Sequence, residues 1–170
     1  MSLDHHGFVV IDKPENLSSA GVVSHVKRTL DVKKVGHAGT LDPFATGVMV
    51  CCVNRATRLA RFFLGGEKKY EALLHLGIET DTQDATGNKT AERRVPDFSG
   101  AEIQDVFGSF TGLLHQIPPV YSALKHKGVP LYKHARRGKP IQKPARQIVI
   151  LALEIIKIAL PYIRFEVTCS

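Results

Sequence analysis

The first third of the chain combines short apolar runs with one segment of helical spacing. The run Phe8–Ile11 predicts a first strand. Ser18 or Ser19 can cap a helix that extends to about Leu30. Its apolar positions share one helix face: Val22, Val23, Val26 and Leu30. A strand followed by an amphipathic helix is therefore the first predicted pair of elements.

A second pair follows in the same order. The run Val48–Val53 predicts a buried strand. Asn54 comes next and is predicted to cap a helix through Leu64, which Gly65 and Gly66 end. The buried side of this helix is predicted to consist of Leu59, Ala60 and Phe63.

Alternation and a capping signal predict the middle of the chain. Lys69–Leu76 alternates, which places Tyr70 on the core side of a strand, at its beginning. Ser99 and Glu102 match a capping box, which predicts a helix start. The apolar stripe of that helix is Ile103, Val106, Phe107 and Phe110.

The last part of the chain predicts one short helix and two strands. Leu131–Arg137 can form a helix that Gly138 closes. Ile148–Ile158 and Tyr162–Thr168 are apolar or alternating and predict neighbouring strands. Strands that alternate irregularly with helices predict a mixed α+β fold.

Composition limits the class of protein. With 170 residues, 44% of them hydrophobic, residues 1–170 suffice for one globular domain. No apolar run approaches the roughly 20 residues of a membrane span, and no secretion signal opens the chain, so we expect a cytoplasmic protein. We interpret Met1-Ser2-Leu3 as a cloning remnant and not as a targeting sequence. The three cysteines, Cys51, Cys52 and Cys169, have no metal-ligand spacing and predict reduced, buried thiols.

An acidic loop, Thr80–Gly87, is the other segment that could suggest a metal. Its Asp81, Asp84 and Gly87 do not have the spacing of an EF-hand loop. We therefore interpret the loop as structural and predict no metal site.

The net charge of +7 is concentrated in one stretch. No Asp or Glu occurs between Val106 and Leu153, which leaves the rest of the chain nearly neutral. The stretch contains Lys125, Lys127, Lys133, Arg136, Arg137, Lys139, Lys143 and Arg146. A solvated basic face without a partner is one interpretation, and a polyanion-binding surface is the other. The lack of carboxylates favours nucleic acid, while interspersed Gly and Pro argue against a membrane-binding helix.

The segment Gly36–Gly47 is the candidate site for chemistry. Three glycines surround one imidazole, His37, and one carboxylate, Asp42. Pro43 biases Asp42 toward an extended backbone, outside any helix. A turn in which the aspartate only bonds backbone amides is the commoner use of such a pattern. Taken alone, the residues favour this structural turn over a carboxylate held for chemistry.

Five motifs in order resemble one known family. The segment Gly36–Val48 reads G-H-A-G-T-L-D-P-F-A-T-G-V and resembles the central motif of the TruB family of tRNA pseudouridine synthases. The other stretches are D-K-P with S-S (12–19), K-Y (69–70), T-D-T-Q-D-A-T-G (80–87) and Q-I-P-P-V-Y-S-A-L-K (116–125), the last followed by G-V-P-L-Y-K-H-A-R-R-G. Asn16 stands where the family's D-K-P motif usually has Gly.

The resemblance implies a fold and a boundary. The fold is the pseudouridine synthase fold, a mixed, mostly antiparallel sheet flanked by helices, with a central cleft and a basic loop–helix insert at about residues 115–146. Residues 1–170 would be its catalytic domain. After Ser170 the family continues into a K-G-T-Y-I-R segment, whose arginine faces the catalytic aspartate, and often into an RNA-binding domain.

The resemblance also implies a function, the isomerisation of uridine to pseudouridine at position 55 in the T arm of tRNA. Asp42 would be the catalytic carboxylate, as nucleophile or as stabiliser and base. Either role needs the ionised form, which a buried aspartate keeps best beside a cation or amide donors. The reaction requires no cofactor, and we expect a monomer. The alternatives are an inactive fragment that binds T-arm RNA, and a basic scaffold protein.

The remaining site residues follow from the same resemblance. Tyr70 would stack on the flipped base, although the residues alone favour a tyrosine packed in the core. His37 would occupy space in the RNA, although a single histidine in a loop commonly has no function. The residues that support the central loop would be Lys13, Pro14, Gly36 and Gly39. The candidates for RNA contact are Lys125, Lys127, Lys133, Arg136 and Arg137.

Overall fold

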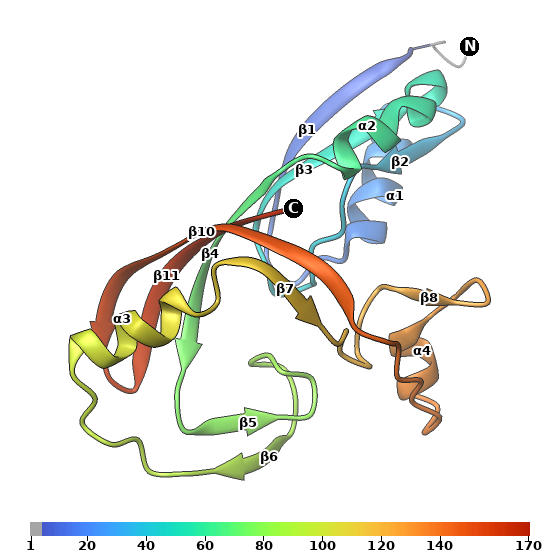
Figure 1. Ribbon diagram of the computed structural model, residues 1–170. Coiled ribbons are helices and arrows are strands. Elements are labelled where there is room, and N and C mark those ends of the chain that lie inside the picture. The colour runs from blue at the N-terminus through green and yellow to red at the C-terminus, as the bar shows by residue number, and fades with distance from the viewer. Residues whose placement is uncertain (1–4) are drawn as a thin grey trace. The chain divides into compact units, whose positions relative to one another are not determined.

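The computed structural model describes residues 5–170, so the interpretation of Met1-Ser2-Leu3 lies outside the described residues. The chain forms two compact units, Met1–Gly66 and Glu67–Ser170. Each unit has its own antiparallel sheet, with helices packed on it (Figure 1). The α+β class is therefore confirmed.

The first unit contains a three-stranded sheet with β3 in the centre. β1 (Gly7–Lys13) and β2 (Val35–His37) pair with opposite edges of β3 (Gly47–Val53), both antiparallel. The two apolar runs predicted as strands are thus β1 and β3. β2 is short and ends at His37, where the candidate loop begins.

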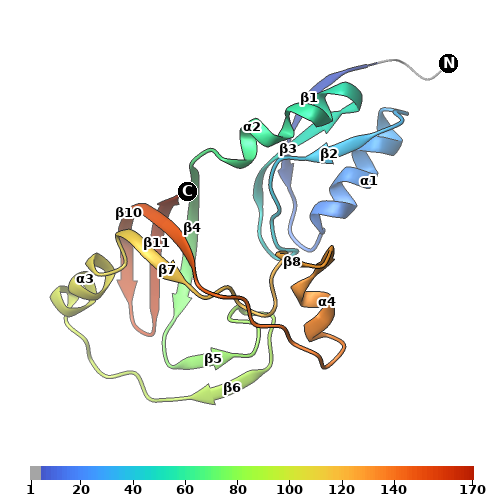
Figure 2. The same cartoon turned by 45° about the vertical axis from the view of Figure 1, so that its right-hand side comes forward.

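Helix α1 (Ser19–Thr29) covers one face of this sheet (Figure 2). Its Val22 and Val26 pack with Met49 and Cys51 of β3, and burial of such side chains contributes about 1.5–3 kcal/mol each. Ser18 is the N-cap, and its hydroxyl accepts a hydrogen bond from the Gly21 backbone N–H. The helix and its apolar face are as predicted.

The segment after β3 differs from the prediction. Instead of one helix capped by Asn54, a 3₁₀-helix η1 (Asn54–Leu59) leads into a short α2 (Ala60–Leu64), and Val53 is the N-cap. Asn54 has a left-handed backbone (φ 51°), and its side chain accepts from the Lys34 N–H and donates to the His5 carbonyl. Asparagine tolerates this conformation better than most residues.

The predicted buried side of that helix is also wrong. Leu59 and Phe63 are 44% and 43% exposed, and Ala56 is the residue that the segment buries. A 3₁₀ turn contains three residues rather than 3.6, so positions spaced for an α-helix no longer share one face.

The second unit contains a four-stranded antiparallel sheet in the order β4-β11-β10-β7. These strands are β4 (Lys68–His75), β7 (Gly112–Gln116), β10 (Arg146–Ala159) and β11 (Tyr162–Cys169). Three of them, β4, β10 and β11, agree with the predicted strands within two residues at every boundary. Ion pairs between Lys69 and Glu166 and between Arg164 and Glu71 join β4 to β11 on one face.

Helix α3 (Gly100–Gly108) lies along this sheet (Figure 1). The predicted capping box is present, because Ser99 Oγ accepts from the Glu102 N–H and the Glu102 carboxylate accepts from the Ser99 N–H. Phe107 meets Phe165 of β11 edge to face, with ring centroids 5.4 Å apart. Val106 and Phe110 are exposed, so only part of the predicted stripe is buried. Phe110 lies beyond the end of the helix at Gly108.

The acidic loop connects two short strands, β5 (Ile78–Thr80) and β6 (Lys89–Glu92). Asp84 Oδ1 accepts hydrogen bonds from the Thr86 N–H and from the hydroxyls of Thr82 and Thr86. Asp81 accepts similarly from the backbone and side chain of Asn88. Both carboxylates thus serve the loop itself, and residues 5–170 contain no cluster of three or more His, Cys, Asp or Glu arranged to hold a metal.

We expect Asp84→Asn to destabilise the second unit by about 1 kcal/mol at neutral pH. Burial of Asp84 is outweighed by these hydrogen bonds, which hold its pKa below the ordinary value of 3.8. A lowered pKa stabilises the folded state above the ordinary pKa, and this contribution is lost as the pH falls through the folded pKa. Urea unfolding at pH 7 and pH 3 measures the effect, with the exposed Asp97→Asn as control. A deficit that is equal at both pH values would contradict the prediction.

The prediction of reduced, buried thiols is met fully by Cys51 and Cys52 and only in part by Cys169. Cys51 and Cys52 are free and fully buried in β3, and burial raises the pKa of both thiols, which makes them unreactive. Cys169 is free and partly exposed. Among the helices of residues 5–170, none has the length and apolar character that crossing a membrane requires.

Candidate active site

The candidate loop connects β2 to β3 in the first unit. Asp42 lies outside any helix, as Pro43 predicts, and its carbonyl accepts from the Ala45 N–H to close a turn. Its side chain is exposed, and within residues 5–170 it forms no hydrogen bond or ion pair. The assumption of a buried aspartate is therefore wrong, because the loop is held through the backbone of Leu41 and Pro43, which leaves the Asp42 side chain exposed.

Lys13 anchors the loop on the C-terminal side of Asp42. The Lys13 side chain is 0% exposed. Its ammonium group donates to the carbonyls of Pro14, Leu17 and Pro43 at 2.9, 2.7 and 3.0 Å. These three bonds use every donor of the ammonium group. The residue directly after Asp42 is thus tied to the end of β1.

Ser19 anchors the loop on the other side of Asp42. Its hydroxyl donates to the Leu41 carbonyl at 2.9 Å and accepts from the Leu41 N–H at 3.0 Å. Ser19 itself is buried at the first turn of α1. Sequence reasoning missed this role and treated Ser18 and Ser19 as alternative caps. The available signal was the pair itself, since one serine suffices to cap the helix and the second remains free for another bond.

His37 and the glycines form the other end of the loop. His37 is half-buried at the end of β2, opposite Cys51, and its Nδ1 accepts a long hydrogen bond (3.4 Å) from the Gly39 N–H. Gly39 has a φ of 152°, which favours glycine at this position. Gly36 lies beside Thr57 of η1 with ordinary packing room. His37 and Asp42 thus belong to one loop of the first unit.

Tyr70 belongs to the second unit, near the start of β4, where it pairs with Val167 of β11. It is 39% exposed, so it is not a core residue, although it follows the alternation of Ala72 and Leu74. Since Asp42 and Tyr70 belong to different units, their predicted meeting in a central cleft stays a prediction.

We expect Ser19→Ala to loosen the Asp42 loop with a modest loss of stability, about 1–2 kcal/mol. The variant leaves the amide and carbonyl of Leu41 without their partner, so amide hydrogen exchange at Leu41 should accelerate. Ser18→Ala is the matched control, because it removes the helix cap but no bond to the loop. Equal exchange rates at Leu41 in the two variants would contradict this role of Ser19.

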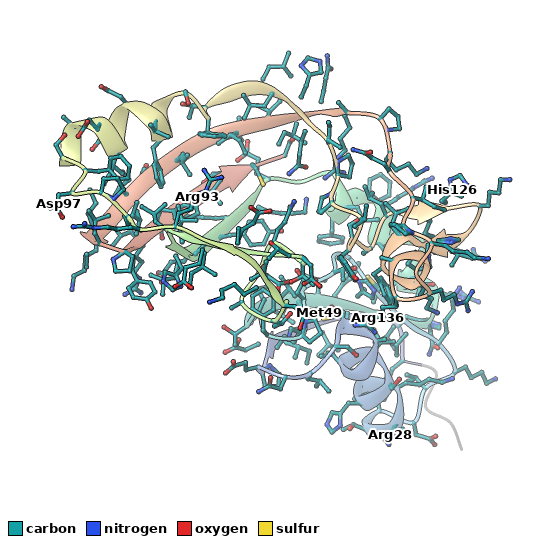
Figure 3. All side chains as sticks on the ribbon, turned by 90° about the horizontal axis from the view of Figure 1, so that it is seen from below. Arg28, Met49, Arg93, Asp97, His126 and Arg136 are labelled. Atoms are coloured by element: carbon teal, nitrogen blue, oxygen red, sulfur yellow. The ribbon has the colours of Figure 1, made fainter. Side chains whose placement is uncertain are left out.

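The basic insert lies in the second unit. It consists of the hairpin β8 (Lys125–His126) and β9 (Val129–Pro130) and the helix α4 (Leu131–Ala135), close to the predicted helix. Leu131 is completely buried and Ala135 nearly so, which gives the insert a small core. Figure 3 shows His126 and Arg136 on the hairpin and at the end of the helix, with many side chains directed outward.

The five candidate RNA contacts are all exposed, and within residues 5–170 none forms an ion pair: Lys125, Lys127, Lys133, Arg136 and Arg137. The Arg136 guanidinium lies 5.4 Å from the ring centre of Tyr132. Burial, followed by the charges of Lys143 and Lys127, lowers the pKa of His126, which favours the neutral form of this imidazole. The insert therefore presents several cations with neutral rings among them, a surface that suits phosphates and bases.

The antiparallel sheets, the loop that presents an aspartate before β3 and the basic insert define the pseudouridine synthase fold. Residues 27–170 match the family model described as TruB family pseudouridylate synthase (N terminal domain). The chain belongs to the TruB family.

Individual relatives agree with this assignment. The tRNA pseudouridine synthase B of Hydrogenovibrio crunogenus is 45% identical over 164 residues, which cover 96% of this chain and 54% of the relative. The chain thus spans about half the length of the curated relative it matches. Among solved structures, a Cbf5-Nop10-Gar1 complex contains a similar chain, with a TM-score of 0.69, 28% identity, and coverage of 96% of this chain and 39% of that one. An H/ACA RNP bound to a substrate RNA containing 2'-deoxyuridine matches with a TM-score of 0.65, 25% identity and coverage of 96% and 37%.

Proposed function

We propose that this chain is the catalytic part of an enzyme that converts uridine to pseudouridine at position 55 in the T arm of tRNA. The observation that carries the proposal is the presentation of Asp42, an exposed carboxylate held by Ser19 on one side and Lys13 on the other. Membership of the TruB family and the similarity to the tRNA pseudouridine synthase B of Hydrogenovibrio crunogenus support the substrate class.

The chemistry needs one ionised carboxylate and no group donor. The bond between C1′ and N1 breaks, the uracil turns, and a bond between C1′ and C5 forms. The proton on C5 leaves, and N1 gains one, so the reaction conserves every atom. The Asp42 carboxylate attacks C1′ as a nucleophile or stabilises a cationic sugar and serves as the base, as carboxylates do in glycoside chemistry. Its exposed position leaves it open to a nucleoside from solution.

The target base has to leave its stack before Asp42 can reach C1′. Extrusion costs a few kcal/mol, which stacking and pocket contacts offset. In this proposal Tyr70 stacks on the flipped base, and His37 occupies space in the RNA. Lys13, Pro14, Gly36 and Gly39 keep the loop in place. The basic insert holds the RNA backbone through Lys125, Lys127, Lys133, Arg136 and Arg137. A cytoplasmic location and a monomeric state stay predictions.

The test is a turnover assay on T-arm stem-loop RNA, with pseudouridine scored chemically. The same RNA with cytidine at position 55 is the control substrate. Two protein forms are compared, the 170-residue chain and a chain extended through the family's K-G-T-Y-I-R segment. Pseudouridine formed at position 55 by either form supports the proposal. RNA binding without turnover by both forms overturns it and favours the inactive RNA-binding fragment.

A further inference from the structure

A cavity in the second unit is lined by residues between 116 and 146, but by none of the five candidate RNA contacts. It has a volume of about 430 Å³ and lies between the end of β7, the loop that follows it and the start of β10. This volume falls in the range of about 300–1,000 Å³ that is typical of small-molecule sites. The cavity is lined by neither Asp42 nor Tyr70.

One wall of the cavity is polar and is built on paired strands. Gln116 and Arg146 are opposite one another in the register of β7 and β10. The Arg146 guanidinium donates to the Gln116 side-chain oxygen at 3.5 Å, which is too long for a strong bond. No carboxylate occurs between residues 106 and 153, and within residues 5–170 Arg146 forms no ion pair. The guanidinium therefore keeps donors for an anionic ligand.

A second feature of the cavity is a buried hydroxyl without a partner. Ser122 lines the cavity, and its Oγ forms no hydrogen bond within residues 5–170 although it is buried. Such a group costs about 1–3 kcal/mol unless a water or a ligand satisfies it. Ser122 itself lines the cavity, so this hydroxyl lies directly behind the cavity wall.

The cavity is also lined by apolar residues, Pro118, Pro119 and Leu124. Apolar side chains, an amide and a guanidinium around one cavity match one nucleotide: the base packs on the apolar side chains, the Gln116 amide can donate and accept at the base edge, and Arg146 pairs with phosphate. We propose that this cavity binds one unstacked nucleotide of the substrate RNA, other than the reacting uridine. The proposal rests on the proposed function only for the source of the nucleotide.

A double-mutant cycle between protein and RNA tests this proposal. T-arm RNAs that each carry one abasic loop nucleotide are bound to the native chain and to Gln116→Ala. For one loop position we expect the abasic RNA to bind the native chain roughly tenfold more weakly, the loss of one base contact. With Gln116→Ala the same RNA should show almost no further loss. Additive losses at every position would overturn the base site.

Arg146 supplies the second arm of the test. Arg146→Met should weaken RNA binding roughly tenfold at fixed salt, whereas Lys157→Met removes the same charge from an exposed site further along β10 and should have a much smaller effect. Arg146→Lys separates a built site from general charge, because lysine keeps the charge but loses the fork of donors. If Arg146→Lys binds like the native chain and Arg146→Met like Lys157→Met, the phosphate contact is wrong.

Nucleoside 5′-monophosphates and inorganic phosphate are the direct probes. NMR titration should shift the Ser122 and Leu124 amides with the nucleotides and not with phosphate alone. Equal shifts with phosphate, or none with any probe, overturn the site. This readout requires no turnover, so a failed turnover assay with positive titrations contradicts only the proposed function.

Discussion

Asp42→Asn should lower the rate of pseudouridine formation by roughly 10³-fold or more, and leave the first unit folded. Asparagine has the shape of aspartate, but its neutral amide can neither attack C1′ nor stabilise a cationic sugar. Because the Asp42 side chain forms no hydrogen bond or ion pair with the described part of the chain, the free energy of unfolding should change by less than about 0.5 kcal/mol.

The measurement is single-turnover formation of pseudouridine with saturating protein, in whichever of the two protein forms turns over T-arm RNA. Glu15→Gln is the matched control, since it makes the same carboxylate-to-amide change at an exposed position of the same unit. RNA affinity is measured in parallel. A rate within tenfold of the native rate, at unchanged affinity, would remove Asp42 from the chemistry and leave the loop with a structural role.

Lys13→Met should destabilise the first unit by about 3–5 kcal/mol. Methionine has a similar length, but it removes three hydrogen bonds and leaves the carbonyls of Pro14, Leu17 and Pro43 without their donor. A domain is commonly stable by only about 5–15 kcal/mol, so this loss is a large part of the total. The loop should lose its anchor beside Asp42 at the same time.

Native-state hydrogen exchange measures this effect unit by unit, through the amides of β1 and β3 for the first unit and those of β10 and β11 for the second. Lys33→Met is the control, because Lys33 is exposed in the same unit. We expect faster exchange in β1 and β3 for Lys13→Met only. Equal protection in the two variants would show that the buried ammonium does not hold the unit together.

Most elements could be predicted because their signals are local. Val22 and Val26 are four residues apart, and Ser99 and Glu102 of the capping box are three apart. The structure contains both the buried helix face and the capping box that these pairs predict. The segment after Asn54 could not be predicted in this way, since a left-handed residue and a 3₁₀ turn change the period that the prediction assumes. Leu59 and Phe63 are therefore exposed.

For the candidate site, too, the local features could be predicted from the sequence and the long-range contacts could not. The amino-acid sequence by itself determined the α+β class, the local elements and, through its motifs, the family and the aspartate proposed for the chemistry. Only the tertiary structure decided how Asp42 is held. Lysine side chains usually lie at the protein surface, yet the side chain of Lys13 is buried. Its bond to Pro43 spans 30 residues and the bond of Ser19 to Leu41 spans 22. No period in the sequence encodes such contacts, because they exist only once β1, α1 and the loop have packed together.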